Sequence, residues 1–237
     1  SLNEYLEHVP HEYREKMKDK VIYLEKDKSD ASLRSQLLSE GIQTIEVDDY
    51  IDPHFMQHVE TKKMGDHTLT FGSIDSEIAN ILGLDNATEN DQKVKDLFQD
   101  NLLEKKDDKA EEKDKNDPPS MMGDSSVEIE VQNIKNSTGP AFFRVDEQMK
   151  RLSKMTQSMG NAQFPMKKTL VINPSNPLIL NALKIHEKGD QEGLVKKICQ
   201  YVEDLAYISS EGLKIEERDK FVKRSQELMS DLTNLAL

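Results

Sequence analysis

The sequence predicts an α+β fold, in which a small αβα unit precedes a mixed α+β domain that ends in two helices. Three observations support this prediction. Short β-rich runs alternate with helical patterns over residues 1–83, a charged run without apolar periodicity occupies 104–126, and two long amphipathic patterns close the chain. We therefore expect two units, 1–86 and 87–237, with the charged run inside the second.

The first unit contains a strand–helix–strand pattern. KVIYLE (20–25) is typical of a buried strand, a helical pattern with capping residues at both ends spans 29–41, and IQTIEV (42–47) is the next strand. One helix between two strands favours a parallel pair with a right-handed crossover. A helix is then expected with Asp52 as its cap and Pro53 at its first position, and another strand is expected within HTLTFGSI (67–74).

The second unit begins with a helical pattern at 91–103, and three short strands follow it. The charged run at 104–126 cannot bury enough apolar surface to offset the entropy of ordering, so we expect a flexible segment there. VEIEV (127–131) alternates apolar residues with glutamates, as a half-buried strand does, and AFFRV (141–145) is its expected partner. The last strand is expected at 167–172.

Three helical patterns follow this strand. In the first, Ser175 or Asn176 can cap the N-terminus, Pro177 lies in the first turn and Gly189 marks the end. The other two, expected at roughly 190–209 and 215–235, carry apolar stripes, which two antiparallel helices cannot both bury alone. A second copy of the chain would complete a four-helix bundle, whereas packing on the preceding strand and helix would bury the stripes within one chain. The stripes comprise Leu194, Ile198, Tyr201, Val202 and Leu205, then Phe221, Leu228, Leu232 and Leu235.

The stretch DEQMKRLSKMTQSMG (146–160) predicts an amphipathic helix of unusual composition. Its apolar residues lie within an arc of about 120° when each residue advances about 100° around the helix axis. These residues are Met149, Leu152, Met155 and Met159. Amphipathic helices usually bury their apolar stripe, which favours a core role. A flexible, polarisable methionine face also suits a surface that accepts varied partners.

Charge and composition exclude several classes of protein. The net charge of −13 argues against a nucleic-acid backbone or an anionic membrane as partner. The sequence has neither an apolar run of about 18 residues, the length a membrane span needs, nor a signal-peptide pattern at its start. The first residue is Ser1 rather than methionine, from which we expect a fragment of a longer protein.

Candidate chemistry in the sequence is weak. Cys199 is the only cysteine, and a lone cysteine on a helix is usually a small packed hydrophobe. His54 and His58 share a helix face, but Phe55 stands where a zinc-protease motif has glutamate. We also find neither a glycine-rich phosphate loop nor a pair of carboxylates marked for acid–base catalysis. We therefore expect no enzymatic activity and no metal site in this chain by itself.

Two stretches of the chain together resemble the ninety-kilodalton heat-shock protein family in its bacterial HtpG form. SLNEYLEHV through KVIYLEKDKSDASLRSQLLSEGIQTIEVDDYIDPHFMQHV resembles the end of that family's middle domain. VDEQMKRLSKM, followed by KKTLVINPSNPLILNAL and two closing helices, resembles its C-terminal dimerisation domain. The most specific points are GIQTIEVDDYID and LVINPSNPLI. The charged run at 104–126 fits the family pattern least well.

The resemblance implies a client-binding and homodimerisation fragment of an ATP-dependent chaperone for unfolded or partly folded proteins. The family's last two helices form a dimeric four-helix bundle, which implies an interface of Ile198, Val202, Leu205, Phe221, Leu228, Leu232 and Leu235. Its amphipathic client-binding helix matches 146–160, which implies client contacts at Met149, Leu152, Met155 and Met159. A family tryptophan that also contacts clients falls within DPHFM, where this chain has His54 and Phe55.

The resemblance also implies the setting of the protein. We expect a stress-response chaperone of a bacterial cytoplasm, whose ATP and Mg²⁺ bind in a domain outside this fragment, so that no cofactor binds here. The sequence ends in DLTNLAL rather than in the acidic tail that recruits eukaryotic TPR co-chaperones. Expected partners are a second copy, client proteins and co-chaperones of the bacterial cytosol. The alternative is a purely structural dimerisation module that contacts no client itself.

Overall fold

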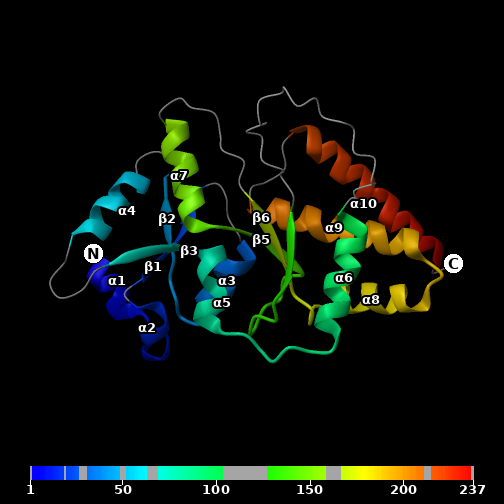
Figure 1. Ribbon diagram of the computed structural model, residues 1–237, viewed down its shortest axis with the longest axis horizontal. Helices are drawn as coiled ribbons and strands as arrows, with labels where there is room; N and C mark the ends of the chain where they lie inside the picture. Colours follow the sequence, from blue (N-terminus) through cyan, green and yellow to red (C-terminus); the bar gives the residue numbers. More distant parts are fainter. Residues whose placement is uncertain are drawn as a thin grey trace, which may run out of the picture.

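The chain is a mixed α+β structure with two small sheets and a C-terminal helix pair, as the sequence predicted (Figure 1). This computed structural model describes residues 2–18, 20–26, 31–48, 52–62, 69–103, 127–158, 167–210 and 215–235. The expected flexible segment at 104–126 lies outside the described residues. Figure 1 places the two ends of the chain at opposite ends of the molecule's long axis.

The first sheet is entirely parallel, with strand order β2-β1-β3. Its strands are β1 (Lys20–Glu25), β2 (Ile45–Val47) and β3 (Thr70–Ser73), and its helices are α1 (Leu2–His8), α2 (His11–Met17), α3 (Ala31–Ser39), α4 (Asp52–Thr61) and α5 (Ile74–Leu82). The parallel β1–β2 pair joined through α3 confirms the expected strand–helix–strand unit.

Strand β1 has apolar neighbours on both faces of the sheet, which explains why its residues form a continuous apolar run. Ile22 and Leu24 pack with residues of α3 and α5, such as Leu37 and Ile78. Val21 and Tyr23 point to the other face, where Met56 and Val59 of α4 cover them. The first sheet is therefore the middle layer of a three-layer αβα unit.

The second sheet has strand order β4-β6-β5. It comprises β4 (Glu128–Val131), β5 (Ala141–Val145) and β6 (Lys168–Ile172), with β4 parallel and β5 antiparallel to β6. The expected direct pairing of 127–131 with 141–145 is therefore wrong, because β6 lies between them. The central position suits β6, whose Leu170, Val171 and Ile172 are all buried, whereas the glutamates of β4 suit an edge strand.

Helices cover both faces of the second sheet. One face is covered by α6 (Asn90–Leu102), α8 (Pro177–Lys188) and α9 (Glu192–Ser210), which share one core with Phe143 and Leu170. On the opposite face, Phe142 and Val171 join the core cluster that contains α5. Helix α5 thus contributes to the first unit and also packs against the second sheet.

The cap expected for α8 is present. The side chain of Asn176 accepts a hydrogen bond from the backbone N–H of Leu178 at 2.9 Å, Pro177 occupies the first turn, and Gly189 ends the helix at φ = 74°. That left-handed conformation is strained for a residue with a Cβ atom. Of the two candidate caps, the structure uses Asn176.

Helix α10 (Ile215–Leu235) packs against α9 at the end of the chain. Arg224 of α10 contacts Asp204 through two hydrogen bonds of 3.0 and 2.5 Å, and Lys197 contacts Asp231 at 2.6 Å. The two pairs run in opposite order along the two helices, so α9 and α10 are antiparallel. Within the described ranges, every helix is too short or too polar to cross a lipid bilayer.

Candidate binding surface

Helix α7 (Glu147–Ser158) starts directly after β5 and contains the methionine-rich stretch. Asp146 caps its N-terminus, because its Oδ1 accepts a hydrogen bond from the backbone N–H of Met149 at 3.0 Å. The helix continues from the second sheet but lies beside the first, at the end of β1 and β3 (Figure 1). Its position therefore depends on contacts between the two parts of the molecule.

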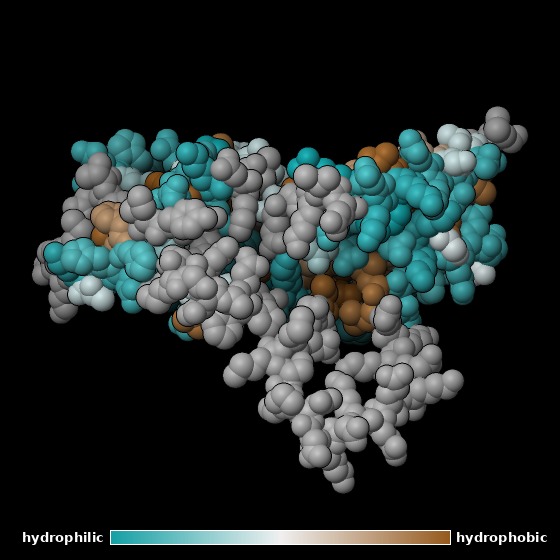
Figure 2. Space-filling view, turned by 90° about the horizontal axis from the view of Figure 1, so that it is seen from above, coloured by the Kyte–Doolittle hydropathy of each residue, from teal (hydrophilic) through white to brown (hydrophobic). Residues whose placement is uncertain are grey.

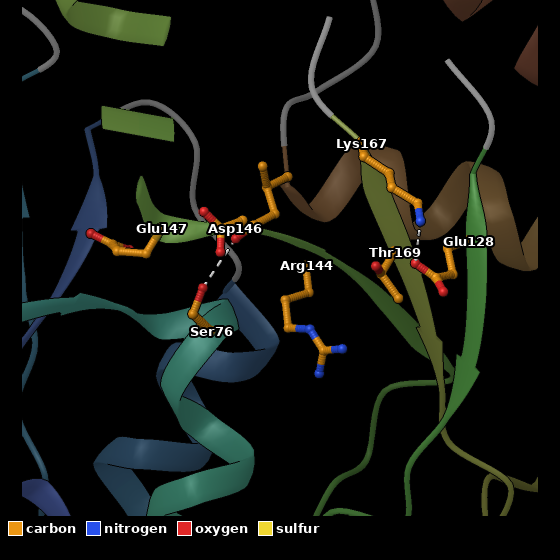
Figure 3. A pocket seen from close by; sticks show the side chains of 8 residues that line it. Ser76, Glu128, Arg144, Asp146, Glu147, Lys167 and Thr169 are labelled. Carbon is orange, nitrogen blue, oxygen red and sulfur yellow. Dashed lines mark hydrogen bonds and ion pairs between the residues drawn. The ribbon is translucent and has the colours of Figure 1, made fainter. Parts of the chain in front are cut away.

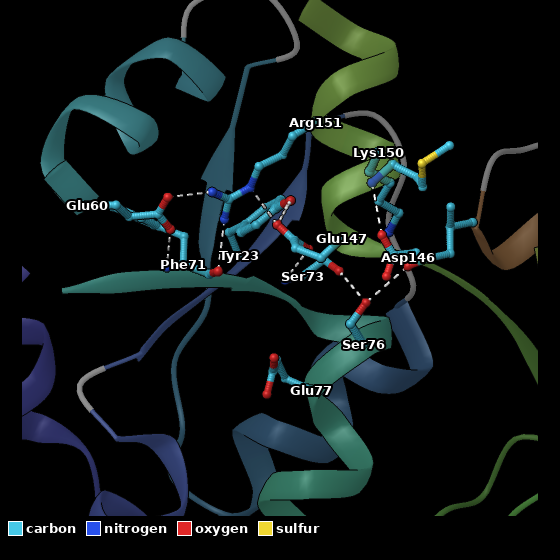
Figure 4. Close-up of polar contacts among 12 residues, drawn as sticks. Tyr23, Glu60, Phe71, Ser73, Ser76, Glu77, Asp146, Glu147, Lys150 and Arg151 are labelled. Atoms are coloured by element: carbon cyan, nitrogen blue, oxygen red, sulfur yellow. Dashed lines mark hydrogen bonds and ion pairs between the residues drawn. The ribbon is translucent and has the colours of Figure 1, made fainter. Parts of the chain in front are cut away.

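The carboxylate of Glu147 is the first of these contacts (Figure 4). Its Oε1 accepts a hydrogen bond from the hydroxyl of Tyr23 at 2.7 Å, and its Oε2 accepts one from the backbone N–H of Ser73 at 3.0 Å. Tyr23 and Ser73 are paired residues on neighbouring parallel strands. Burial, together with this carboxylate, raises the pKa of the Tyr23 hydroxyl, so it stays a hydrogen-bond donor at neutral pH.

Arg151 lies one turn further along α7 and makes three contacts in different directions (Figure 4). Its Nε donates to Glu147 at 2.8 Å, its Nη1 to Glu60 of α4 at 2.7 Å, and its Nη2 to the backbone carbonyl of Phe71 at 2.8 Å. Glu60 in turn accepts a hydrogen bond from the Phe71 N–H at 2.9 Å. Burial opposes the charge on Arg151, but its carboxylate partners outweigh burial and raise the pKa of the guanidinium.

Lys150 makes a second, separate ion pair. Its Nζ lies 2.7 Å from Oδ1 of Asp75 in α5, and the side chains of both residues are largely buried. The other oxygen of Asp75 accepts a hydrogen bond from the backbone N–H of Val145, just before the helix. Burial of Lys150 disfavours its charge, but the neighbouring Asp75 more than compensates and raises the pKa of the lysine.

The opposite side of α7 carries its apolar residues. Met149 is 40% exposed and Leu152 is 49% exposed. The expectation from periodicity, that these two residues belong to a core, is therefore wrong: α7 buries Glu147, Lys150 and Arg151 and exposes Met149 and Leu152. The side chain of Met155 and all of Met159 lie outside the described part of the chain.

The other two residues expected to contact clients lie on α4, and both are exposed, with Phe55 at 51%. Helix α4 contacts α7, and the Glu60–Arg151 ion pair joins the two helices. The structure thus places His54 and Phe55 on an element adjacent to Met149 and Leu152.

The residues expected at a dimer interface have different environments. Ile198, Val202 and Leu228 lie in the core of their own chain, so they offer almost no surface to a second copy. Leu205 and Phe221 are partly buried, and Leu232 and Leu235 are exposed. The prediction of a dimer interface therefore rests on Leu205, Phe221, Leu232 and Leu235.

Further apolar residues on the C-terminal helices are exposed but were not expected at an interface. They are Ile208, Val222 and Met229. Val222 and Met229 are seven residues apart on α10 and so share one side of it. Seen from above, the half of the molecule that contains α9 and α10 has hydrophobic groups between predominantly hydrophilic side chains (Figure 2).

The charged residues that position α7 gave no clear signal in the sequence. Glu147, Lys150 and Arg151 have the spacing of an ordinary solvated polar face. Their partners are distant in the sequence: Tyr23 and Glu147 are 124 positions apart, and Glu60 and Arg151 are 91 positions apart. A pattern of local periodicity cannot identify such pairs.

A pocket of about 360 Å³ separates the start of α7 from the second sheet (Figure 3). Asp146 and Glu147 line one side, and Glu128, Arg144 and Lys167 lie on the other. Both cations already have carboxylate partners, since Lys167 pairs with Glu128 at 2.9 Å and Arg144 with Glu130 at 2.6 Å. The charges that line the pocket thus largely compensate one another, so nothing in it singles out a charged ligand.

The residues considered for enzymatic chemistry lie on two different helices, α9 and α4. Cys199 is buried in the core, and burial raises the pKa of its thiol to about 12. His54 and His58 are exposed on α4. Among the residues that the structure describes, histidine, cysteine and carboxylate side chains nowhere gather in threes that would hold a metal ion.

Comparison of the chain with protein-family models and with curated proteins finds no match.

Proposed function

We propose that this chain is the client-binding and homodimerising part of an ATP-dependent molecular chaperone of the ninety-kilodalton heat-shock family, of the bacterial type. The observation that carries the proposal is the orientation of α7. The helix buries Glu147, Lys150 and Arg151 in ion pairs and turns Met149 and Leu152 toward solvent. Exposed apolar side chains held on an anchored helix are suited to bind apolar segments of unfolded proteins.

Apolar burial would drive binding. Removing apolar surface from water yields about 25 cal/mol per Å² before the cost of ordering the client is subtracted. Methionine adapts its shape to different partners, which suits clients without a common sequence. Phe55 is also exposed on the adjacent α4 and would offer a further apolar contact for a client. In this proposal ATP and Mg²⁺ bind elsewhere in the parent chaperone, and this chain hydrolyses nothing.

The C-terminal helices support the dimeric part of the proposal. Leu232 and Leu235 are exposed on α10, and Leu205 and Phe221 are only partly covered. A second α9–α10 pair would cover such residues in a four-helix bundle. Two client-binding faces in one dimer would raise the effective concentration of weak contacts.

The client-binding part is tested with Leu152→Ser and Met149→Ser. Both side chains are exposed, so we expect little change in the urea midpoint and weaker binding of reduced, carboxymethylated α-lactalbumin, which is permanently unfolded. Leu38→Ser, which changes a similarly exposed leucine on α3, is the matched control and should leave binding unchanged. Unchanged binding in both α7 variants would favour the alternative, a purely structural dimerisation module.

The dimer is tested by light scattering after gel filtration over a dilution series. A dimer has twice the chain mass of 27.1 kDa and should persist on dilution. Leu232→Asp should shift the equilibrium toward the monomer, because it places a charge where a second copy would pack. A stable monomer at all concentrations would contradict this part of the proposal and would leave the α7 experiment unaffected.

A further inference from the structure

Four elements of the first unit, β1, β3, α4 and α5, contact the first two turns of α7 through polar groups. We propose that Arg151, together with Glu147, is a positioning device that fixes the rotation of α7 about its axis and so holds Met149 and Leu152 outward. This inference rests on the proposed function, because it assigns a role to the residues behind the client-binding face. Neither residue touches the client.

The geometry of Arg151 specifies one rotation of the helix. Its guanidinium donates to α4 through Glu60, to β3 through the carbonyl of Phe71, and to α7 itself through Glu147. Two of these bonds leave the helix in different directions and the third fixes the guanidinium plane on α7, so together they define an orientation, whereas a single ion pair defines only a distance. Lysine, with a single nitrogen on a flexible stem, cannot reproduce this fork.

Glu147 completes the arrangement. Both of its oxygens bind the first sheet, one through the hydroxyl of Tyr23 and the other through the N–H of Ser73. Glu147 and Arg151 are four residues apart and share one side of α7. Rotating the helix by about half a turn would bury Met149 and Leu152 but would leave these polar groups of β1, β3 and α4 without partners.

Lys150 and Asp75 add a second fixed point. Asp75 binds both Lys150 and the backbone N–H of Val145, so it holds the helix and the end of β5 together. Ser76, in the same turn of α5, donates to the carbonyl of Val145 at 3.1 Å. Ion pairs join α7 to both α5 and α4. The helix can therefore neither rotate nor slide without breaking largely buried ion pairs.

A charged anchor also prevents an alternative packing. An apolar anchor would compete with Met149 and Leu152 for the same position, since apolar contacts are non-directional. Ion pairs with fixed partners discriminate between the two faces of the helix, because the wrong face would leave charges buried and unpaired. The structure thus separates the residues that position α7 from those that it presents.

The experiment combines a distance measurement with a binding measurement. Spin labels at Gln57→Cys on α4 and Leu152→Cys on α7, in a Cys199→Ala background, report the orientation of α7 by double electron–electron resonance. Arg151→Met should broaden the distance distribution. In unlabelled protein it should weaken binding of reduced, carboxymethylated α-lactalbumin about tenfold, if the outward orientation falls to about one tenth of the population.

Three further variants complete the experiment: a control, a conservative replacement of Arg151 and a milder substitution. Arg34→Gln breaks an exposed ion pair with Glu46 in the same unit and should change neither measurement. Arg151→Lys, which keeps the charge but not the fork, should give intermediate values. If Arg151→Met does not fold, Glu60→Gln removes only one partner of the fork, and the same two measurements apply.

The outcomes separate the positioning role from the proposed function. A broadened distribution with weakened binding supports the inference. An unchanged distribution, or a broadened one with unchanged binding, overturns it, and the proposed function stands if Leu152→Ser still weakens binding. If Leu152→Ser has no effect on binding, the proposed function fails and the presenting role fails with it, whatever the labels report.

Discussion

Helices α7 and α9 are both amphipathic, yet they bury opposite faces. Helix α9 packs Ile198 and Val202 into the core and is the usual case. Helix α7 buries Glu147, Lys150 and Arg151 and exposes Met149 and Leu152. Amphipathicity therefore indicates that a helix has two faces, but not which one faces inward. The surface on which the helix lies decides that.

The two surfaces differ in the groups they offer. Helix α9 lies on a face of the second sheet formed by apolar residues such as Phe143 and Leu170. Helix α7 meets the end of β1 and β3, where a tyrosine hydroxyl, backbone N–H groups and the carboxylates of Glu60 and Asp75 need partners. An apolar face placed there would remove the partners that α7 supplies, at a cost of about 1–3 kcal/mol for each group left without one.

The largest expected contrast between the two helices concerns thiol reactivity. Burial raises the pKa of the Cys199 thiol on α9 to about 12, whereas a thiol at Leu152→Cys on α7 would be exposed to solvent and free of this effect of burial. At pH 8 we expect Cys199 to react with iodoacetamide about a thousandfold more slowly, because the thiolate is the nucleophile. Similar rates in the native protein and in Leu152→Cys with Cys199→Ala would contradict the burial of this face of α9.

The same pKa makes stability depend on pH. A folded pKa above the unfolded value means that the folded state holds its thiol proton more tightly. This contribution is complete below the unfolded value of about 9 and is lost as the pH rises through about 12. Cys199→Ala should therefore reduce the loss of stability in this alkaline range, measured by urea unfolding at several pH values.

The next contrast is in the free energy of unfolding. Ile198→Ala on α9 removes buried methyl groups and should lower it by about 2–5 kcal/mol. Leu152→Ala on α7 should change it by no more than about 0.5 kcal/mol, because half of that side chain is in solvent. Urea unfolding of both variants measures the difference, and equal losses would contradict the proposed difference in burial.

A smaller contrast distinguishes buried from exposed ion pairs. Arg224→Gln leaves the carboxylate of Asp204, which is only 8% exposed, without its partner, and should cost about 1–3 kcal/mol. Lys93→Gln, which breaks an exposed pair with Glu187, should leave the urea midpoint unchanged.

The pH dependence of Arg224→Gln provides a further check. Burial raises the pKa of Asp204, and Arg224 opposes that shift. Without Arg224 the folded pKa rises further, so stability should be retained at acidic pH and should fall more steeply as the pH rises above about 4. A flat profile would mean that water reaches Asp204 once the arginine is removed.

Local pattern predicted many of the elements, although α1, α2 and α5 were not placed individually. The strand–helix–strand unit, the Asn176 cap and the final two helices all lie close to their expected positions. The order of the second sheet was not predicted, because VEIEV and AFFRV look like partners along the chain while β6 separates them in space. Periodicity identifies a strand but contains little information about which strand lies beside it.

For the binding surface, the sequence determined which residues share a face of α7, because helix geometry fixes that from spacing alone. Only the tertiary structure decided which face is exposed. Glu147, Lys150 and Arg151 become buried because their partners, contributed by β1, β3, α4 and α5, meet at the start of α7. These contacts join residues far apart in the sequence, and the free energy of pairing polar groups depends on where the fold places them, so spacing along the chain cannot predict it.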